Sequence, residues 1–222
     1  MGYSRSLLPN PIPTGEVLDA MLAGIGCGVA ATPLRNANIE DTLLGAVVSG
    51  MEGDDLRHLG LAVQWIALHA RAINADRLVR AIPLLPGERS RACWAAIACW
   101  HQADRRWQRL AHRQEPIELL RVGNAFQMQR RGPDARFDST SLLVPAGTLR
   151  ERPSDVMDPA ALAQWHLGYR HRILLGPSYR ADMWAIAEQE PEVSASVLAR
   201  RAYGSFATAW HVLHDLAVLR GR

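Results

Sequence analysis

The chain has 222 residues, 48% of them hydrophobic, and its 25 basic and 22 acidic side chains give a net charge of +3. This length supports a substantial apolar core in one large or two small domains, so no disulfide or metal is needed to hold the fold. No apolar run approaches the roughly 18 residues of a membrane span, and prolines interrupt the start where a signal peptide needs an apolar stretch, so we expect a soluble cytoplasmic protein.

The first half of the chain is predicted to be an extended arm followed by helices. Residues 1–15 contain three prolines and no hydrophobic period, which indicates an extended arm or a poorly ordered tail. Apolar residues then recur at helical spacing, and the predicted helices span 16–31, 39–51, 54–73, 75–82, 88–102 and 104–113. Asn38 and Asn74 stand where an N-cap is expected. Residues 16–118 are therefore predicted to form a helical array or bundle; since no repeat is visible, a short solenoid and an irregular bundle both remain open.

The composition changes between residues 119 and 158, where Gly, Pro, Ser and Asp recur at short intervals. Such a segment is typical of an irregular linker between two domains. Two short pieces within it, 125–129 and 142–144, are expected to extend and pair as a small hairpin across the turn at 132–134.

Residues 159–222 are predicted to be a C-terminal helical module. Asp158 is a good N-cap with Pro159 at the first helical position, and this first helix is expected to continue to Gly176. Three more helices are predicted over 179–190, 194–202 and 205–220. Trp165, Trp184 and Trp210 are expected to cover the seam between the first helix and the last three.

The last three helices carry a resemblance to a known family. In ASVLARRAYGSFATAWHVLHDLAVL, small residues occur early in the second helix, Gly204 offers the positive φ of a tight turn, and a longer helix follows. This pattern over 179–220 resembles a bacterial helix-turn-helix. The expected fold class is therefore mainly α: a multi-helix array or bundle, at most a small hairpin, then a helix-turn-helix or winged-helix-like module.

A longer stretch, GPSYRADMW and LARRAYGSFATAW, resembles the tails of helix-turn-helix regulators and antitoxin-like partners that are encoded with bacterial nucleotidyltransferase-type toxins. The resemblance implies a DNA-binding transcriptional regulator that acts on its own promoter and whose helical array masks a cognate protein partner. Operators with two-fold symmetry make a homodimer the expected state.

A helix-turn-helix assigns roles to particular side chains. The start of its last helix enters the major groove, and the residues expected at base edges are Ser205, Thr208 and His211. The residues expected to hold phosphates are Tyr179, Arg180, Arg200 and Arg201. Two features oppose the assignment: Asp215 would repel phosphate, and no β-wing follows before Arg222.

The alternative hypothesis is a helical scaffold that binds another protein and no nucleic acid, with the three-helix end as a cap.

The sequence offers no convincing metal or catalytic site. His211, His214 and Asp215 share part of one helix face, but no further metal ligand is recognisable beside them. No motif for a nucleophile or for acid–base chemistry is visible. The sequence therefore predicts no catalytic residue, no metal and no cofactor, and the protein is not expected to be an enzyme.

Overall fold

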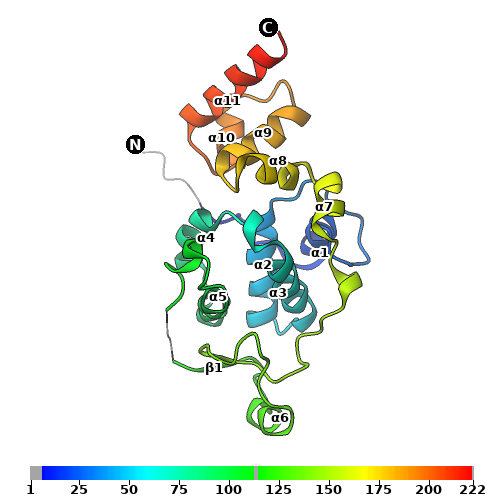
Figure 1. Cartoon of the computed structure of the whole chain (residues 1–222), viewed down its shortest axis with the longest axis vertical. Helices are drawn as coiled ribbons and strands as arrows, with labels where there is room; N and C mark the ends of the chain where they lie inside the picture. The colour runs from blue at the N-terminus through cyan, green and yellow to red at the C-terminus, as the bar shows by residue number, and fades with distance from the viewer. Residues whose placement is uncertain (1–6, 113–114, 222) are drawn as a thin grey trace.

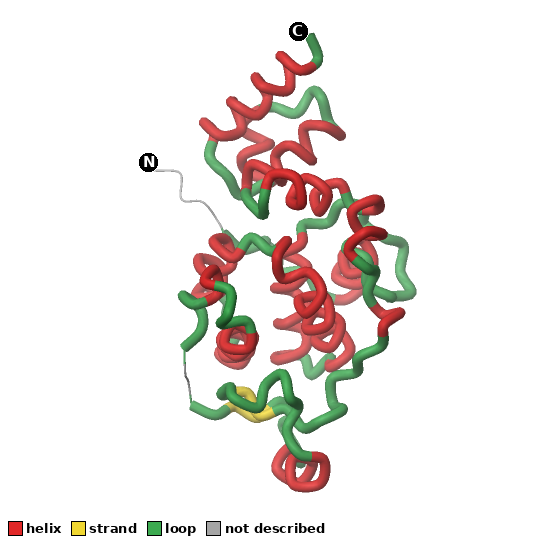
Figure 2. The backbone as a smooth tube through the Cα atoms, viewed as in Figure 1, coloured by secondary structure: helices red, strands yellow, loops and turns green. Residues whose placement is uncertain are grey.

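The computed structural model describes residues 7–112 and 115–221, and nearly all of its regular structure is helical (Figure 2). These residues form eleven α-helices, four short 3-10 helices and one two-stranded parallel sheet. Residues 7–175 form a body around one hydrophobic core, and residues 179–219 form a unit at one end with a small core of its own (Figure 1). None of the described helices is both long enough and apolar enough to cross a bilayer.

The body begins with five helices of unequal length packed as an irregular bundle (Figure 1). They are α1 (Gly15–Gly24), α2 (Ile39–Glu52), α3 (Leu56–His69), α4 (Ala75–Ala81) and α5 (Glu88–Trp100). The predicted caps at Asn38 and Asn74 are confirmed, since their side chains accept N–H bonds from Asp41 and Arg77 at 3.1 and 3.2 Å. Helix α2 is central because both α3 and α5 pack against it.

Two of the predicted helices are shorter in the structure. The helix expected over 16–31 ends at Gly24, because Gly26 takes a positive φ of 86° and the N–H groups of Gly26 and Cys27 bond back to the carbonyls of Ala23 and Leu22 at 3.1 and 2.9 Å. The helix expected over 104–113 is only a 3-10 turn, held by the Asp104 side chain, which accepts the Arg106 N–H at 3.0 Å. The 3-10 helices are η1 (Ala70–Ala72), η2 (Ile82–Leu84), η3 (Arg105–Trp107) and η4 (Pro153–Asp155).

The predicted hairpin within 119–158 is wrong. All of its first strand, 125–129, lies in a helix, α6 (Asn124–Arg131), and β2 (Leu142–Leu143) pairs in parallel with β1 (Ile117–Glu118). A strand at 125–129 would have to bury alternate residues, whereas Phe126 is 62% exposed and only the first residue of α6 is buried.

The same segment is more than a linker between two domains, because its apolar side chains complete the core of the body. The buried residues that it contributes are Leu119, Phe137, Leu142, Val144, Leu149 and Val156.

The helix expected from 159 to 176 is divided into α7 (Pro159–Trp165) and α8 (Leu167–Leu175). His166 separates them with extended backbone, and its ring Nδ1 accepts the Tyr169 N–H at 2.9 Å, which caps α8. Leu162 and Tyr169 belong to the core of the body, so the separate C-terminal unit starts at α9 rather than at residue 159.

The two ends of the chain agree with their predictions where the structure describes them. Residues 7–14 of the predicted arm have no helix or strand, and Pro13 is buried against the body. The last three helices are α9 (Tyr179–Gln189), α10 (Ala195–Arg201) and α11 (Phe206–Leu219), as the spacing predicts. Residues 1–6 of the arm, residue 113 of the predicted 104–113 helix, and Arg222 lie outside the described residues.

Candidate functional site

The C-terminal unit, α9 to α11, has helix starts that are fixed by three serines. Ser178, Ser194 and Ser205 each precede a helix and accept a backbone N–H from three residues further on, at 3.3, 3.4 and 2.9 Å. These caps satisfy N–H groups that the start of a helix leaves unpaired. Mostly small side chains let the helices pack closely, and the buried set is Met183, Ala187, Leu198, Ala199, Ala202, Ala209, Val212 and Leu216.

The turn between α10 and α11 consists of residues 202–205. The prediction that Gly204 takes a positive φ is wrong, because the residue that does so is Tyr203, with φ at 54°. Glycine at 204 leaves room for its neighbours: a Cβ there would displace the terminal methyl group of Met183 and lie 3.2 Å from the Cβ of Tyr179. A left-handed backbone is unfavourable for tyrosine, so the side chain must be held in place by other contacts.

The three residues predicted at base edges lie together at the start of α11, but their side chains differ in accessibility. The Ser205 and Thr208 hydroxyls are 2.6 Å apart, and Ser205 is also the cap, so both are hydrogen-bonded within the unit. His211 is exposed, with its ring edge-on to Trp210 at 5.2 Å between centroids. His211 is therefore the most accessible of the three.

Two of the predicted phosphate residues have carboxylate partners. Arg180 on α9 lies 2.7 Å from Asp215 on α11, and Arg201 contacts both oxygens of Glu190 at 2.6 and 2.8 Å. The Arg201 guanidinium holds the pKa of the Glu190 carboxyl below its usual value. The predicted repulsion between Asp215 and phosphate is thus reduced by Arg180.

The other two predicted phosphate residues lie in contrasting surroundings. The Tyr179 hydroxyl accepts a hydrogen bond from Arg80 of α4 at 2.7 Å, which places Tyr179 at the seam with the body. Arg200 is exposed at the end of α10, and no carboxylate among the described residues lies within ion-pair distance of it. Of the four predicted phosphate residues, Arg200 is therefore the one readiest to take an anion.

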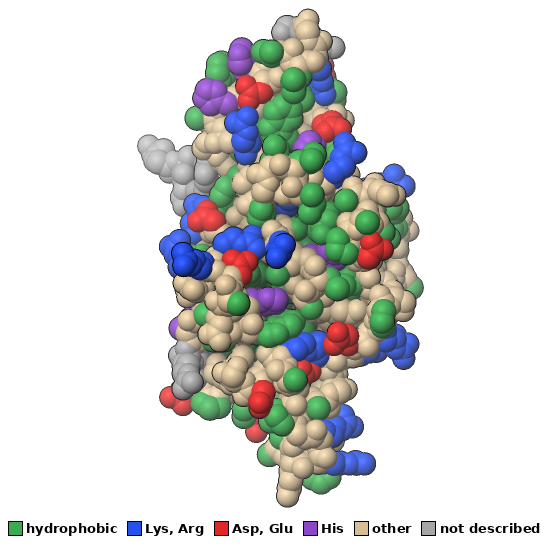
Figure 3. All heavy atoms as spheres, in the orientation of Figure 1, with side chains coloured by type: hydrophobic (Ala, Val, Ile, Leu, Met, Phe, Trp, Pro, Cys, Tyr) green, Lys and Arg blue, Asp and Glu red, His purple; other side chains and the backbone are tan. Residues whose placement is uncertain are grey.

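Helix α11 also presents an apolar face that the sequence prediction missed. Phe206, Trp210 and Val218 are 57%, 51% and 62% exposed, and with His214 they recur every fourth residue, so they share one face. The Trp210 and His214 rings stack with centroids 5.5 Å apart. Figure 3 shows histidine side chains among hydrophobic ones at this end of the molecule. The prediction that Trp210 covers the seam is wrong.

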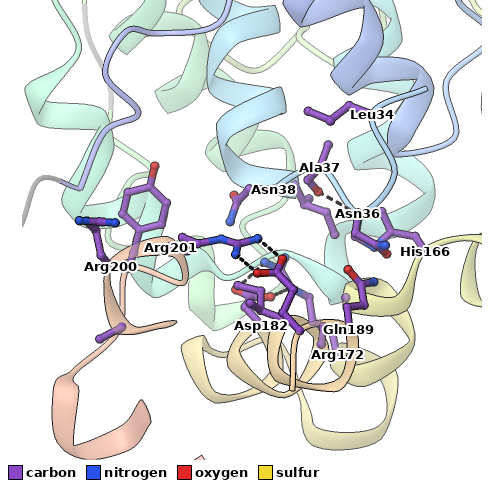
Figure 4. Close-up of a pocket in the computed structure, with 18 of the residues that line it drawn as sticks. Leu34, Asn36, Ala37, Asn38, His166, Arg172, Asp182, Gln189, Arg200 and Arg201 are labelled. Carbon is purple, nitrogen blue, oxygen red and sulfur yellow. Dashed lines mark hydrogen bonds and ion pairs between the residues drawn. The ribbon is translucent and has the colours of Figure 1, made fainter. Parts of the chain in front are cut away.

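A groove of about 1130 Å³ lies between the body and the C-terminal unit (Figure 4). In Figure 4 the body supplies Leu34, Ala37 and Asn38 on one side, and the C-terminal unit supplies Gln189 and Arg201 on the other. The two walls come from segments about 150 positions apart in the sequence, which is why no local pattern revealed the groove.

A buried ion cluster at the groove ties the body to the C-terminal unit. Arg172 of α8 is only 3% exposed, and it donates to both oxygens of Asp182 on α9 at 2.7 and 2.9 Å. It also donates to both oxygens of Glu40 on α2 at 2.6 and 2.7 Å. Burial opposes the charge on Glu40, but Arg172 and then Arg77 hold the pKa of this carboxyl below its usual value.

A second contact inserts the turn of the C-terminal unit into the body. The Tyr203 hydroxyl donates to Asp41 of α2 at 3.0 Å, and the Arg77 guanidinium lies over the Tyr203 ring at 3.5 Å. Arg77 is itself buried, pairs with Asp41 and donates to Asn38 at 2.6 Å. These contacts hold Tyr203 in its left-handed backbone and fix the orientation of the unit.

His166 lines the groove but is not available as a base or a metal ligand. Burial lowers the pKa of His166 to about 4, so its ring is neutral near pH 7. Both ring nitrogens are engaged, one with the Tyr169 N–H and the other with the Ala37 carbonyl at 2.9 Å. Across the described residues, no three His, Cys, Asp or Glu side chains are grouped as a metal site requires.

Comparison with known proteins returns no match, whether to a protein family, to a curated protein or to a solved structure. Inferences about function therefore rest on the C-terminal unit and on the groove.

Proposed function

We propose that the protein is a DNA-binding transcriptional regulator whose C-terminal unit contacts duplex DNA through α10 and the start of α11. The arrangement of α10, the turn at 202–205 and α11 carries the proposal. A seven-residue helix, a four-residue turn and a fourteen-residue helix pack on a third helix, α9. The DNA-binding helix-turn-helix has this order, and its second helix enters the major groove.

The start of α11 offers side chains suited to a major groove. Ala207 and Phe206 are exposed and apolar, and such side chains contact the thymine methyl group. His211 adds a polar ring on the next turn of the helix. Ser205 and Thr208 bond to each other, yet each hydroxyl retains acceptor capacity toward a base edge. This surface favours sites that contain thymine.

Phosphate contact is assigned to Arg200 and Arg201 at the end of α10 and to Arg180 at the start of α9. Residues 179–222 contain five arginines and five acids, so DNA binding would depend on a few placed contacts rather than on a broad basic field. The carboxylate partners of Arg180 and Arg201 are all exposed to solvent, and exposed ion pairs contribute little stability. Phosphate oxygens can therefore replace them at small cost.

The wider role follows from the resemblance of the tail to antitoxin-like regulators. In this proposal the protein binds its own promoter as a homodimer on a two-fold symmetric site, and the helical body binds a cognate protein partner.

The test is the affinity of the full chain for a fluorescent duplex from the region upstream of its own gene, measured by anisotropy at low salt. Arg200→Ala is expected to weaken binding several-fold on every sequence, because a phosphate contact carries no base information. Arg130→Ala is the matched control, since Arg130 is an exposed arginine of α6 at the far end of the molecule (Figure 1). A wild-type chain that binds no duplex, or equal binding by Arg200→Ala, would contradict the proposal.

The apolar face of α11 favours a second candidate function, a scaffold that binds another protein. The helix carries no charged side chain before Asp215, whereas Phe206 and Trp210 expose large apolar surfaces. Exposed apolar patches mark protein-binding surfaces. In this case the wild type would retard no duplex, and a stoichiometric protein partner would co-purify with the wild type but not with Trp210→Ser.

A further inference from the structure

We infer that the groove between the body and the C-terminal unit binds a small amphipathic organic anion, with the acidic group of the ligand at Arg200 and its apolar part against Leu34, Ile186 and Phe206. This site differs from the proposed DNA contact in its occupant and in its wall from the body, but it shares Arg200 and Phe206 with that contact. The inference rests on the size, the charge and the apolar lining of the groove.

The size and position of the groove are those of a ligand site. Small molecules commonly occupy cavities of about 300–1,000 Å³, often at the junction between two structural units. The groove has about 1130 Å³ and lies at such a junction. The Arg172 cluster and the Tyr203 contact link its two walls, so the space is already formed without a ligand.

The charges that line the groove leave it positive. Its four arginines face only two carboxylates, and those two are already paired: Asp182 with Arg172, and Glu190 with Arg201. The remaining cations are Arg35 and Arg200, and neither has an ion-pair partner among the described residues. His166 adds no charge near pH 7, because its pKa is lowered to about 4. An anion entering the groove would therefore meet uncompensated positive charge.

The lining also exposes apolar surface that a ligand would cover. Leu34 and Phe206 are 50% and 57% exposed, although both lie in a concave site where neighbouring side chains could have covered them. Ile186, which is partly buried, extends this lining on the wall from the C-terminal unit. A purely polar anion would leave this surface in water, so the complementary ligand has an apolar body as well as an acidic group.

Polar groups in the groove can orient such a ligand. The side-chain amide of Gln189 lies at the groove (Figure 4) and supplies both a donor and an acceptor. An exposed arginine with free donors can bind a carboxylate, sulfonate or phosphate through two parallel hydrogen bonds. Arg200 is thus expected to determine the preference for an anion, while Phe206 is expected to contribute affinity without regard to charge.

The test uses two fluorescent probes that differ only in an acidic group: anilinonaphthalenesulfonate, an anion, and phenylnaphthylamine, its neutral counterpart. Each is titrated into the full chain without DNA. The anion is expected to bind saturably, at one site per chain and at least tenfold more tightly than the neutral probe. Arg200→Glu is expected to weaken the anion at least tenfold and to leave the neutral probe unchanged, because a charge-assisted hydrogen bond is lost.

Two further variants locate the site. Phe206→Ser should weaken both probes, whereas Arg130→Glu, on exposed α6, should alter neither. Equal affinities of the two probes for the wild type, or an unchanged anion affinity in Arg200→Glu, would overturn the inference. Since no DNA is present, failure here leaves the proposed function untouched, and failure of DNA binding leaves this inference untouched.

Discussion

Replacing Arg172 with methionine is expected to destabilise the protein by about 3–5 kcal/mol near pH 7, the range for removing one partner of a buried ion pair. Arg172 donates two hydrogen bonds to Asp182, two to Glu40 and one to the Ala72 carbonyl at 3.0 Å. Both carboxylates are buried, so among the described residues the variant leaves Asp182 without an ion-pair partner and Glu40 with only Arg77, at 3.6 Å, while methionine fills the space of the aliphatic stem. Denaturant unfolding followed by circular dichroism measures the loss.

The deficit of Arg172→Met should depend on pH in a defined direction. Without the guanidinium, burial raises the folded-state pKa of Glu40 and Asp182 above their unfolded values of roughly 4. A carboxyl with a raised folded-state pKa stabilises the variant fully below the unfolded pKa, and this stability is lost as pH rises. The difference in unfolding free energy between wild type and variant should therefore shrink as pH falls from 7 to 4. Adding Glu40→Gln and Asp182→Asn should recover stability at pH 7. A deficit under about 1 kcal/mol, or one that does not vary with pH, would refute the buried-charge explanation.

Three more outcomes are expected. The free energy of unfolding should fall as pH is lowered from 6.5 to about 4. The cause is the depressed folded-state pKa of His166, since the unfolded chain takes up the proton first. In denaturation experiments across this range, the free energy of unfolding of His166→Asn should vary less steeply with pH than that of the wild type. Tyr203→Phe removes the bond to Asp41, should cost about 1.5–3 kcal/mol and should speed amide exchange in α10 and α11; unchanged exchange would contradict this. Gly24→Ala forces a Cβ onto the Leu34 carbonyl, so Tm should drop for a loss of about 1–3 kcal/mol; an equal Tm would contradict the close approach.

Much of the helical structure could be predicted because its signals are local. The caps at Asn38, Asn74 and Asp158 and the hydrophobic periods act within a few residues, and helices begin after all three caps. The errors have two causes. The first helix ends at a local signal, the positive φ of Gly26, which the prediction passed over in favour of the hydrophobic period. The break at His166 instead depends in part on a distant contact, the bond to residue 37.

The groove and its ion clusters were missed for the same reason. Glu40 and Arg172 are 132 positions apart, and nothing in the pattern around either residue names its partner. No local signal marked either residue as buried, since Glu40 is followed by Asp41 and Arg172 is preceded by Arg170 and His171, so each belongs to a polar stretch. The apolar face of α11 was hidden because α11 carries apolar residues on both its buried and its exposed sides.

DNA binding by the C-terminal unit is tested most directly by the salt dependence of its affinity for duplex DNA. Phosphate contacts by Arg180, Arg200 and Arg201 predict a slope of about −3 per chain in a plot of log affinity against log salt, at about −0.9 per contact. Arg200→Ala should reduce the size of the slope by about 0.9, and Arg130→Ala should leave it unchanged. An affinity that does not vary with salt, or the same slope in Arg200→Ala as in the wild type, would contradict DNA binding through this surface.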